Sequence, residues 1–169
     1  MIPEIKKILY ATDLSKNSVY AFYYAVDIAQ KRNAKIIILH VLEPVSPLTR
    51  GFLGEDTVIK IQRQNVEEAI EEINQRLQNF CRITEKKMGG CLELVSNILV
   101  RLGNPVDEIL RLAEAEGCDL IVLGSHGKGF LEHTFLGSVS RMVLDRSRKP
   151  VFIIPLPSEE VDLDWEKMI

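Results

Sequence analysis

Short runs of consecutive apolar residues limit the folds open to this chain. The runs are ILY at 8–10, KIIILHVL at 35–42, DLIVL at 119–123 and VFII at 151–154. A strand with one face in water alternates apolar and polar residues, whereas a strand covered on both faces is apolar throughout. These runs therefore predict strands of a parallel sheet that lies between two layers of helices. Residues 91–100, CLELVSNILV, alternate in part and predict a fifth strand.

The segments between these runs carry apolar residues three or four positions apart, which is the spacing of one helix face. Such stripes lie within residues 19–29, 66–81, 106–113 and 136–143. Ser15 and Asn104 are the expected N-caps of the first and third helices, because such side chains accept hydrogen bonds from the free N–H groups of a helix start. The order of strands and helices predicts a doubly wound, five-stranded parallel α/β sheet with helices on both faces, a Rossmann-like fold.

The length and composition fit one domain. The chain has 169 residues, of which 46% are hydrophobic, enough to bury a core of its own. We expect residues 1–157 to form this domain and the acidic residues 158–169 to form a C-terminal tail, in which Trp165 either frays or docks. The segment Pro44–Glu55 contains proline, glycine and threonine and predicts a mobile loop after the second strand.

Charge and cysteine content exclude several classes of protein. The net charge is −3, whereas a domain that binds duplex nucleic acid carries a basic excess. The longest apolar run is far shorter than the roughly 20 residues that span a bilayer. Cys81, Cys91 and Cys118 form no CxxC pair, which argues against a disulfide framework and a zinc site. We therefore expect a cytoplasmic protein with reduced thiols and with neither nucleic acid nor membrane as a partner.

Glycine and serine gather where a doubly wound sheet binds ligands, beyond the carboxyl ends of its strands. Residues 124–129, GSHGKG, follow the fourth strand, and residues 137–140, GSVS, open the last helix. Glycines let backbone N–H groups converge on phosphate oxygens, and a helix N-terminus adds further donors. Two such elements suit a polyphosphate. Neither a Walker A loop nor the dinucleotide GxGxxG fingerprint is present.

Several of these side chains have two interpretations. Asp13 either contacts a ligand at this edge of the sheet or caps the first helix. Ser138 binds phosphate or is only a helix N-cap, and the same choice is open for Ser140. Lys128 meets phosphate or is a solvated loop charge, and His40 is more typical of a packed or hydrogen-bonded histidine than of a ligand. No GxSxG or HExxH motif occurs, so we expect no catalytic residue, no protein metal ligand and at most slow hydrolysis of a bound polyphosphate.

The segment GSHGKGFLEHTFLGSVSRMVLDRSRKPVFIIP resembles the C-terminal part of the universal stress protein family. KKILYATDLSKNS, ILHVLEP and RLGNPVDEIL resemble its other landmarks, so the similarity spans residues 6–155. In that family the motif G-x2-G-x9-G-S/T marks the members that bind ATP. It is intact in this chain, as Gly124, Gly127, Gly137 and Ser138.

The resemblance implies a sheet order of 3-2-1-4-5. It places adenosine between the first and fourth strands near Asp13, with the backbone of Val41 facing the adenine. It places the phosphates over residues 127–129 and 137–140, with Mg²⁺ or Mn²⁺ bound through them. It also implies a homodimer formed through the last strand, Val151 to Ile154.

We therefore expect an ATP-binding, universal stress protein-like switch in which bound nucleotide orders the glycine loop and the Pro44–Glu55 loop, changing the surface offered to a protein partner. The alternatives are a nucleotide-independent stress scaffold and an enzyme of nucleotidyl or ATP-hydrolysing type. The residues expected to contact the nucleotide are Ala11, Thr12, Asp13, Val41, Gly124, Ser125, His126, Gly127, Lys128, Gly129, Gly137, Ser138, Val139 and Ser140.

Overall fold

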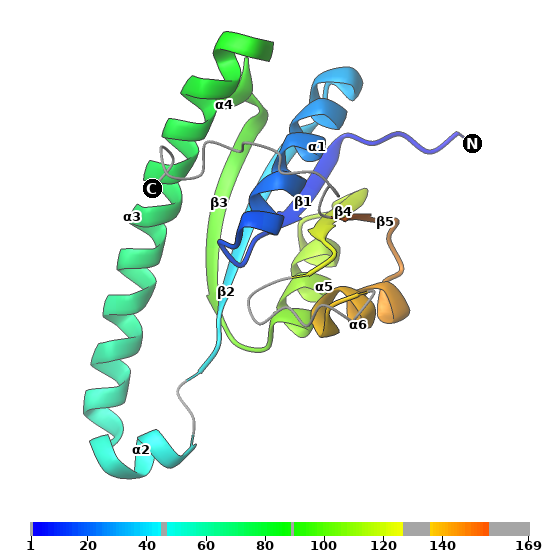
Figure 1. The fold of residues 1–169 in the computed structure, drawn as a ribbon. Helices are drawn as coiled ribbons and strands as arrows, with labels where there is room; N and C mark the ends of the chain where they lie inside the picture. The colour runs from blue at the N-terminus through cyan, green and yellow to red at the C-terminus, as the bar shows by residue number, and fades with distance from the viewer. Residues whose placement is uncertain (1, 45–46, 89, 127–135, 156–169) are drawn as a thin grey trace.

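A five-stranded, all-parallel sheet forms the centre of the computed structural model, which describes residues 2–44, 47–88, 90–126 and 136–155 (Figure 1). The strands lie in the order β3-β2-β1-β4-β5. Their bounds are β1 Lys7–Ala11, β2 Lys35–Leu42, β3 Val95–Leu102, β4 Leu120–Gly124 and β5 Val151–Ile154. The predicted fold class and strand order are confirmed.

The two faces of the sheet are covered by different helices. The helices are α1 Lys16–Arg32, α2 Pro47–Leu53, α3 Glu55–Met88, α4 Cys91–Leu94, α5 Pro105–Ala115 and α6 Ser138–Arg146. Alternate residues of each central strand face opposite layers. Ile8 and Tyr10 of β1 belong to the core cluster under α1 and α3, whereas Leu9 and Ala11 belong to the cluster under α5 and α6. Helices on both faces, as predicted, explain why β1, β2 and β4 consist almost entirely of apolar residues.

The β1 strand is the central one, and its two neighbours define where the sheet changes direction. In register, Ile8 of β1 lies beside Ile36 of β2 on one side and beside Leu120 of β4 on the other. The chain runs outward from β1 to β2 and β3, then returns to the other side of β1 for β4 and β5. The loops that leave β1 and β4 therefore diverge at the same edge of the sheet, where doubly wound folds bind ligands.

Two expectations about local structure are wrong. Residues 91–94 form the short helix α4, and the third strand begins only at Val95. The residue before this helix, Gly90, has a φ of 72°, a left-handed conformation that turns the chain out of α3 and that other residues rarely adopt. The alternation in CLEL resembled a strand because four residues are too few to separate the two periods.

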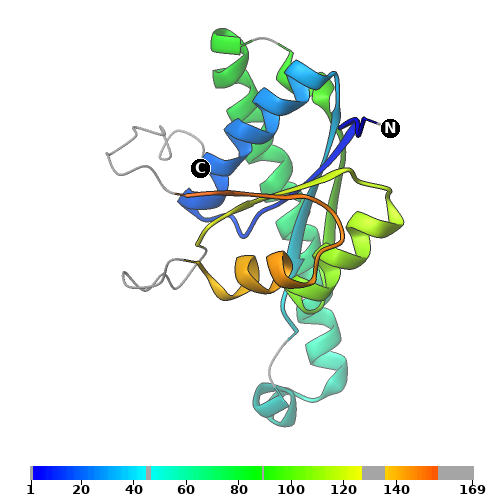
Figure 2. The ribbon, with the colours of Figure 1, turned by 90° about the vertical axis from the view of Figure 1, so that its right-hand side faces the viewer.

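The segment that we expected to be a loop, Pro44–Glu55, contains α2 over residues 47–53. Gly54, with a φ of 75°, then turns the chain directly into α3. The 34 residues of α3 make a helix roughly 50 Å long. Its first turns and α2 extend beyond the sheet in both views (Figures 1 and 2). No helix within the described ranges is both long enough and apolar enough to cross a membrane.

Candidate functional site at the carboxyl ends of β1 and β4

Three segments that lie far apart in the sequence meet beyond the carboxyl ends of β1 and β4. Pairing of Tyr10 with Val122 sets residues 12–14 beside residues 124–126. The N–H of Gly137 donates to the carbonyl of Ser125 at 2.7 Å, which joins the start of α6 to the end of β4. The Ser140 hydroxyl adds a bond of 2.7 Å to the carbonyl of Gly124. Gly124 and Gly137, the two outer glycines of the sequence motif, therefore belong to one site.

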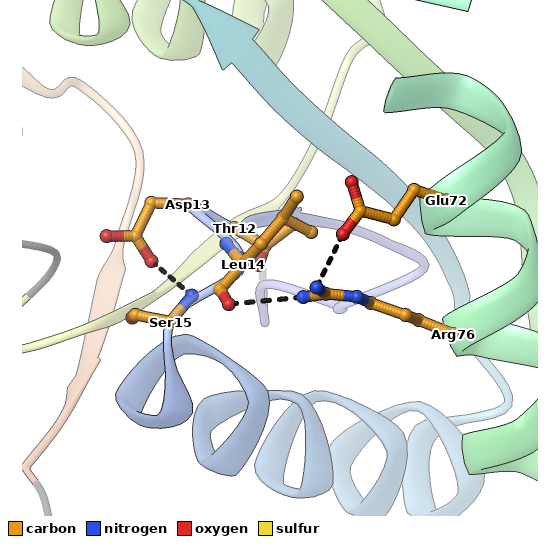
Figure 3. Close-up of polar contacts among 6 residues, drawn as sticks. All are labelled: Thr12, Asp13, Leu14, Ser15, Glu72 and Arg76. Carbon is orange, nitrogen blue, oxygen red and sulfur yellow. Dashed lines mark hydrogen bonds and ion pairs between the residues drawn. The ribbon is translucent and has the colours of Figure 1, made fainter. Parts of the chain in front are cut away.

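The turn between β1 and α1 is built from polar side chains that bind their own backbone. The Thr12 hydroxyl accepts the N–H of Leu14, and Asp13 Oδ1 accepts the N–H of Ser15, both at 3.0 Å (Figure 3). Ser15 is the N-cap of α1, as predicted, and its side chain accepts from Ser18. Asp13 therefore does not cap α1, and its contact with the backbone lies one residue before the helix.

Beneath this turn lies a buried polar network. The hydroxyls of Thr12 and Ser18 are 2.8 Å apart, and the Tyr10 hydroxyl donates to the carbonyl of Ser18. Burial raises the pKa of Tyr10 far above its ordinary value, which keeps this donor neutral. His40 is buried in β2 and donates from Nδ1 to the carbonyl of Thr12 at 2.8 Å. This confirms the expectation of a packed, hydrogen-bonded histidine.

Asn17, in the first turn of α1, holds the end of β4 in place and was missed by the sequence analysis. Its buried side chain accepts the N–H of His126 at 2.7 Å and donates to the carbonyl of Ile154 at 3.4 Å. A Cβ on Gly124 would lie only 3.0 Å from Asn17 Oδ1. Gly124 therefore allows α1 to approach β4 closely, a role separate from the proposed approach of phosphate.

The start of α6 presents backbone N–H groups rather than a side-chain cap. Its N-cap is Gly137, without a side-chain hydrogen bond, and the exposed Ser138 is the first helical residue. The interpretation of Ser138 as the N-cap is therefore wrong. Val139 packs partly against the core, and Ser140 is buried with its hydroxyl bound to Gly124. The first amides of a helix carry a partial positive charge that suits an anion.

Some of the remaining predicted contact residues lie in the described part of the chain, and three of them do not. Ala11 is the buried last residue of β1, and Val41 lies near the end of the neighbouring strand β2. The Ser125 hydroxyl is 2.9 Å from Nδ1 of His126. Gly127, Lys128 and Gly129 lie outside the described residues, as do residues 156–169 with Trp165, so their roles stay predictions. Among the described residues there is no group of three or more His, Cys, Asp and Glu side chains that would hold a metal ion.

This sheet order, with a polar and glycine-containing edge beyond β1 and β4, defines a doubly wound α/β domain. The profile of the universal stress protein family matches residues 4–155. The chain belongs to this family, and the resemblance predicted from its motifs is confirmed.

Individual relatives match over most of their length. Universal stress protein MJ0577 of Methanocaldococcus jannaschii is 32% identical over 153 residues, which cover 88% of this chain and 94% of that protein. The solved structure of MJ0577 is similar to this fold with a TM-score of 0.71 at 28% identity, covering 93% of this chain and all of the other. A universal stress protein solved in complex with cAMP has a TM-score of 0.53 at 26% identity, with 90% and 98% of the two chains covered.

Proposed function

We propose that this universal stress protein binds ATP beyond the carboxyl ends of β1 and β4 and acts as a nucleotide-responsive switch with little hydrolysis. The observation that carries the proposal is the bond between Gly137 and Ser125, which brings the two halves of the glycine motif together at the sheet edge. The structure of a related family member in complex with cAMP supports an adenine nucleotide as the ligand.

The described residues supply donors and acceptors of the kinds that the two ends of ATP require. In the proposed complex, the carboxylate of Asp13 accepts from the ribose, and the backbone of Thr12 and Val41 faces the adenine. The uncapped amides at the start of α6 and the exposed hydroxyl of Ser138 donate to phosphate oxygens. A Mg²⁺ or Mn²⁺ ion would be held by the phosphate oxygens, because the groups at the start of α6 are amides and hydroxyls that donate hydrogen bonds to the phosphates. The cation would screen the charge of the phosphates.

A substitution at Ser138 separates phosphate binding from folding. An acidic residue in the first turn of a helix is favourable for the helix itself, whereas it repels phosphate. We expect Ser138→Asp to keep or raise the melting temperature and to weaken binding of ATP with Mg²⁺ by about tenfold or more, an electrostatic cost of at least about 1.4 kcal/mol. Binding of adenosine should change little. Ser138→Ala serves as the control for the hydroxyl alone.

Isothermal titration calorimetry with ATP, AMP, cAMP and adenosine measures these affinities. The absence of heat at millimolar ATP and Mg²⁺ with the unaltered protein contradicts the proposal and favours a nucleotide-independent scaffold. Release of pyrophosphate or AMP favours an enzyme of nucleotidyl type. Equal loss of ATP and adenosine binding in Ser138→Asp contradicts the placement of the phosphates at α6.

We also propose that the protein is cytoplasmic and forms a homodimer through β5. The position of β5 supports the homodimer, because β5 is the last of the described strands on its side of the sheet. Phe152 of β5 is 41% exposed and Tyr24 of α1 is 38% exposed, and their rings meet edge to face with centroids 6.1 Å apart. Two exposed aromatic residues beside an unpaired strand are typical of an interface. The buried free thiol of Cys118 is compatible with a reducing compartment.

A further inference from the structure

The turn between β1 and α1 contains a conformation that leucine rarely adopts. Leu14 has a φ of 65°, in the left-handed region. The other described residue with a positive φ that is not glycine is Asn33, where asparagine at a helix C-cap tolerates this conformation. A leucine in the left-handed region costs free energy, and this conformation persists only where surrounding contacts hold it. The contacts around Leu14 therefore decide the shape of the turn.

Two of these contacts come from within the turn and one comes from outside it. The N–H groups of Leu14 and Ser15 are bound by the side chains of Thr12 and Asp13. The carbonyl of Leu14 accepts a hydrogen bond of 3.3 Å from Nη1 of Arg76, a residue of α3 that lies 62 positions further along the chain (Figure 3). Arg76 thus completes a set that fixes both peptide groups of Leu14.

Arg76 is itself held in place. Its Nη2 forms an ion pair with Glu72, one turn earlier in α3, and its side chain is only 21% exposed. The neighbouring Ile73 is buried in the core under α1, which seats α3 at this level. Figure 3 shows the guanidinium on one side of the turn and the carboxylate of Asp13 on the other. Arg76 therefore contacts the turn from the side opposite the carboxylate of Asp13.

We propose that Arg76 is a positioning residue for the nucleoside half of the bound nucleotide. By binding the carbonyl of Leu14, it keeps the turn left-handed and so orients Asp13 and the backbone of Thr12. This inference rests on the proposed nucleotide binding at the same site. Because coupling between two sites is reciprocal, a nucleotide that binds this conformation of the turn also stabilises the contact between α3 and the turn.

Two variants at Arg76 and one control test this role. Arg76→Met keeps the aliphatic stem and removes the donors, whereas Arg76→Lys keeps a positive donor. Arg82→Met removes the same group from the same helix, where Arg82 is exposed and bonds to Gln78 and Asn79 of α3. We expect Arg76→Met to weaken the binding of adenosine, of AMP and of Mg·ATP by the same factor of about ten. Arg76→Lys should recover most of this loss, and Arg82→Met should bind like the unaltered protein.

Hydrogen exchange without ligand supplies a second readout. In Arg76→Met, the amides of Leu14 and Ser15 should exchange faster than in the unaltered protein or Arg82→Met. Unchanged affinity or unchanged exchange in Arg76→Met overturns the inference. A loss confined to ATP also overturns it, because it puts Arg76 on the phosphates. If the unaltered protein binds no nucleotide, the proposed function is wrong, and so is the role of Arg76 in nucleotide binding. Hydrogen exchange then still decides whether Arg76 holds the turn.

Discussion

At the scale of single residues, the site depends on a close approach between α1 and β4. The side chain of Asn17 occupies the space that a Cβ on Gly124 would need, with its Oδ1 only 3.0 Å and its Cγ 3.1 Å from that position. The same side chain accepts the N–H of His126, the last described residue before Gly127. A change at Gly124 therefore reaches both the packing of α1 and the course of the chain toward the proposed phosphate position.

We predict that Gly124→Ala lowers the free energy of unfolding by about 1–3 kcal/mol, because the added methyl forces Asn17 away from β4. It should also weaken ATP binding, since the bond to His126 is strained. Gly51→Ala is a matched control, because Gly51 lies exposed in α2 with no heavy atom within 4 Å of its Cβ position. Urea unfolding and calorimetry measure both effects. An unaltered stability in Gly124→Ala contradicts the account of this packing.

The sequence predicts the glycine and serine residues of the candidate site, but it gives no indication of their neighbours Asn17 and Arg76. The motif residues lie on two short segments at strand and helix ends, where local composition is informative. Asn17 and Arg76 contact residues that lie 109 and 62 positions away in the sequence. An asparagine in a first helical turn and an arginine on a charged helix have no local feature that indicates such partners. Only the fold brings them to the site.

At the scale of secondary-structure elements, α1 and α5 begin in the same way at different places. The side chain of Ser15 accepts the N–H of Ser18, and the side chain of Asn104 accepts the N–H of Asp107. Only the first of these helix starts adjoins the turn with Asp13. The two caps therefore provide a pair in which only Ser15 adjoins the turn that contains Asp13.

We predict that Ser15→Ala and Asn104→Ala each lower the free energy of unfolding by about 1 kcal/mol, the ordinary value of a helix N-cap. Ser15→Ala should in addition weaken ATP binding several-fold, because fraying of the first turn of α1 loosens the backbone that Asp13 binds. Chemical denaturation gives the first quantity and calorimetry gives the second. Equal affinity in the two variants contradicts a role for the β1–α1 turn in binding.

Elements with a strong period or a clear end were predicted well. Residues 35–42 and 151–154 are strands with the expected bounds. The apolar run of β2 reflects burial, since residues 36–40 are buried, whereas Ile154 alone is buried among the four residues of β5. The stripe within residues 66–81 belongs to a helix that continues from Glu55 to Met88. Its outer turns were missed because α2 and the first part of α3 extend beyond the sheet, so they need no continuous apolar face. Periodicity indicates burial, and a protruding helix has little of it.

At the scale of the whole molecule, the two edges of the sheet differ. The edge formed by β3 has α3 packed against its strand. On the other side, β5 has no further strand beside it among the described residues, and the aromatic pair of Tyr24 and Phe152 lies there. An unpaired strand edge offers backbone groups to a second chain, and a lysine on such an edge prevents pairing. The difference between the edges makes the proposed homodimer testable with one kind of substitution.

We predict that Phe152→Lys converts a dimer into a monomer, because it places a charge at the proposed interface and removes an aromatic contact. Leu102→Lys is the matched control, since Leu102 ends the opposite edge strand and is 42% exposed, like Phe152. Sedimentation velocity should show dimers for the unaltered protein and for Leu102→Lys. The Phe152→Lys monomer should still bind ATP, because every residue of the proposed site comes from one chain. A monomeric unaltered protein, or dissociation caused by Leu102→Lys alone, contradicts pairing through β5.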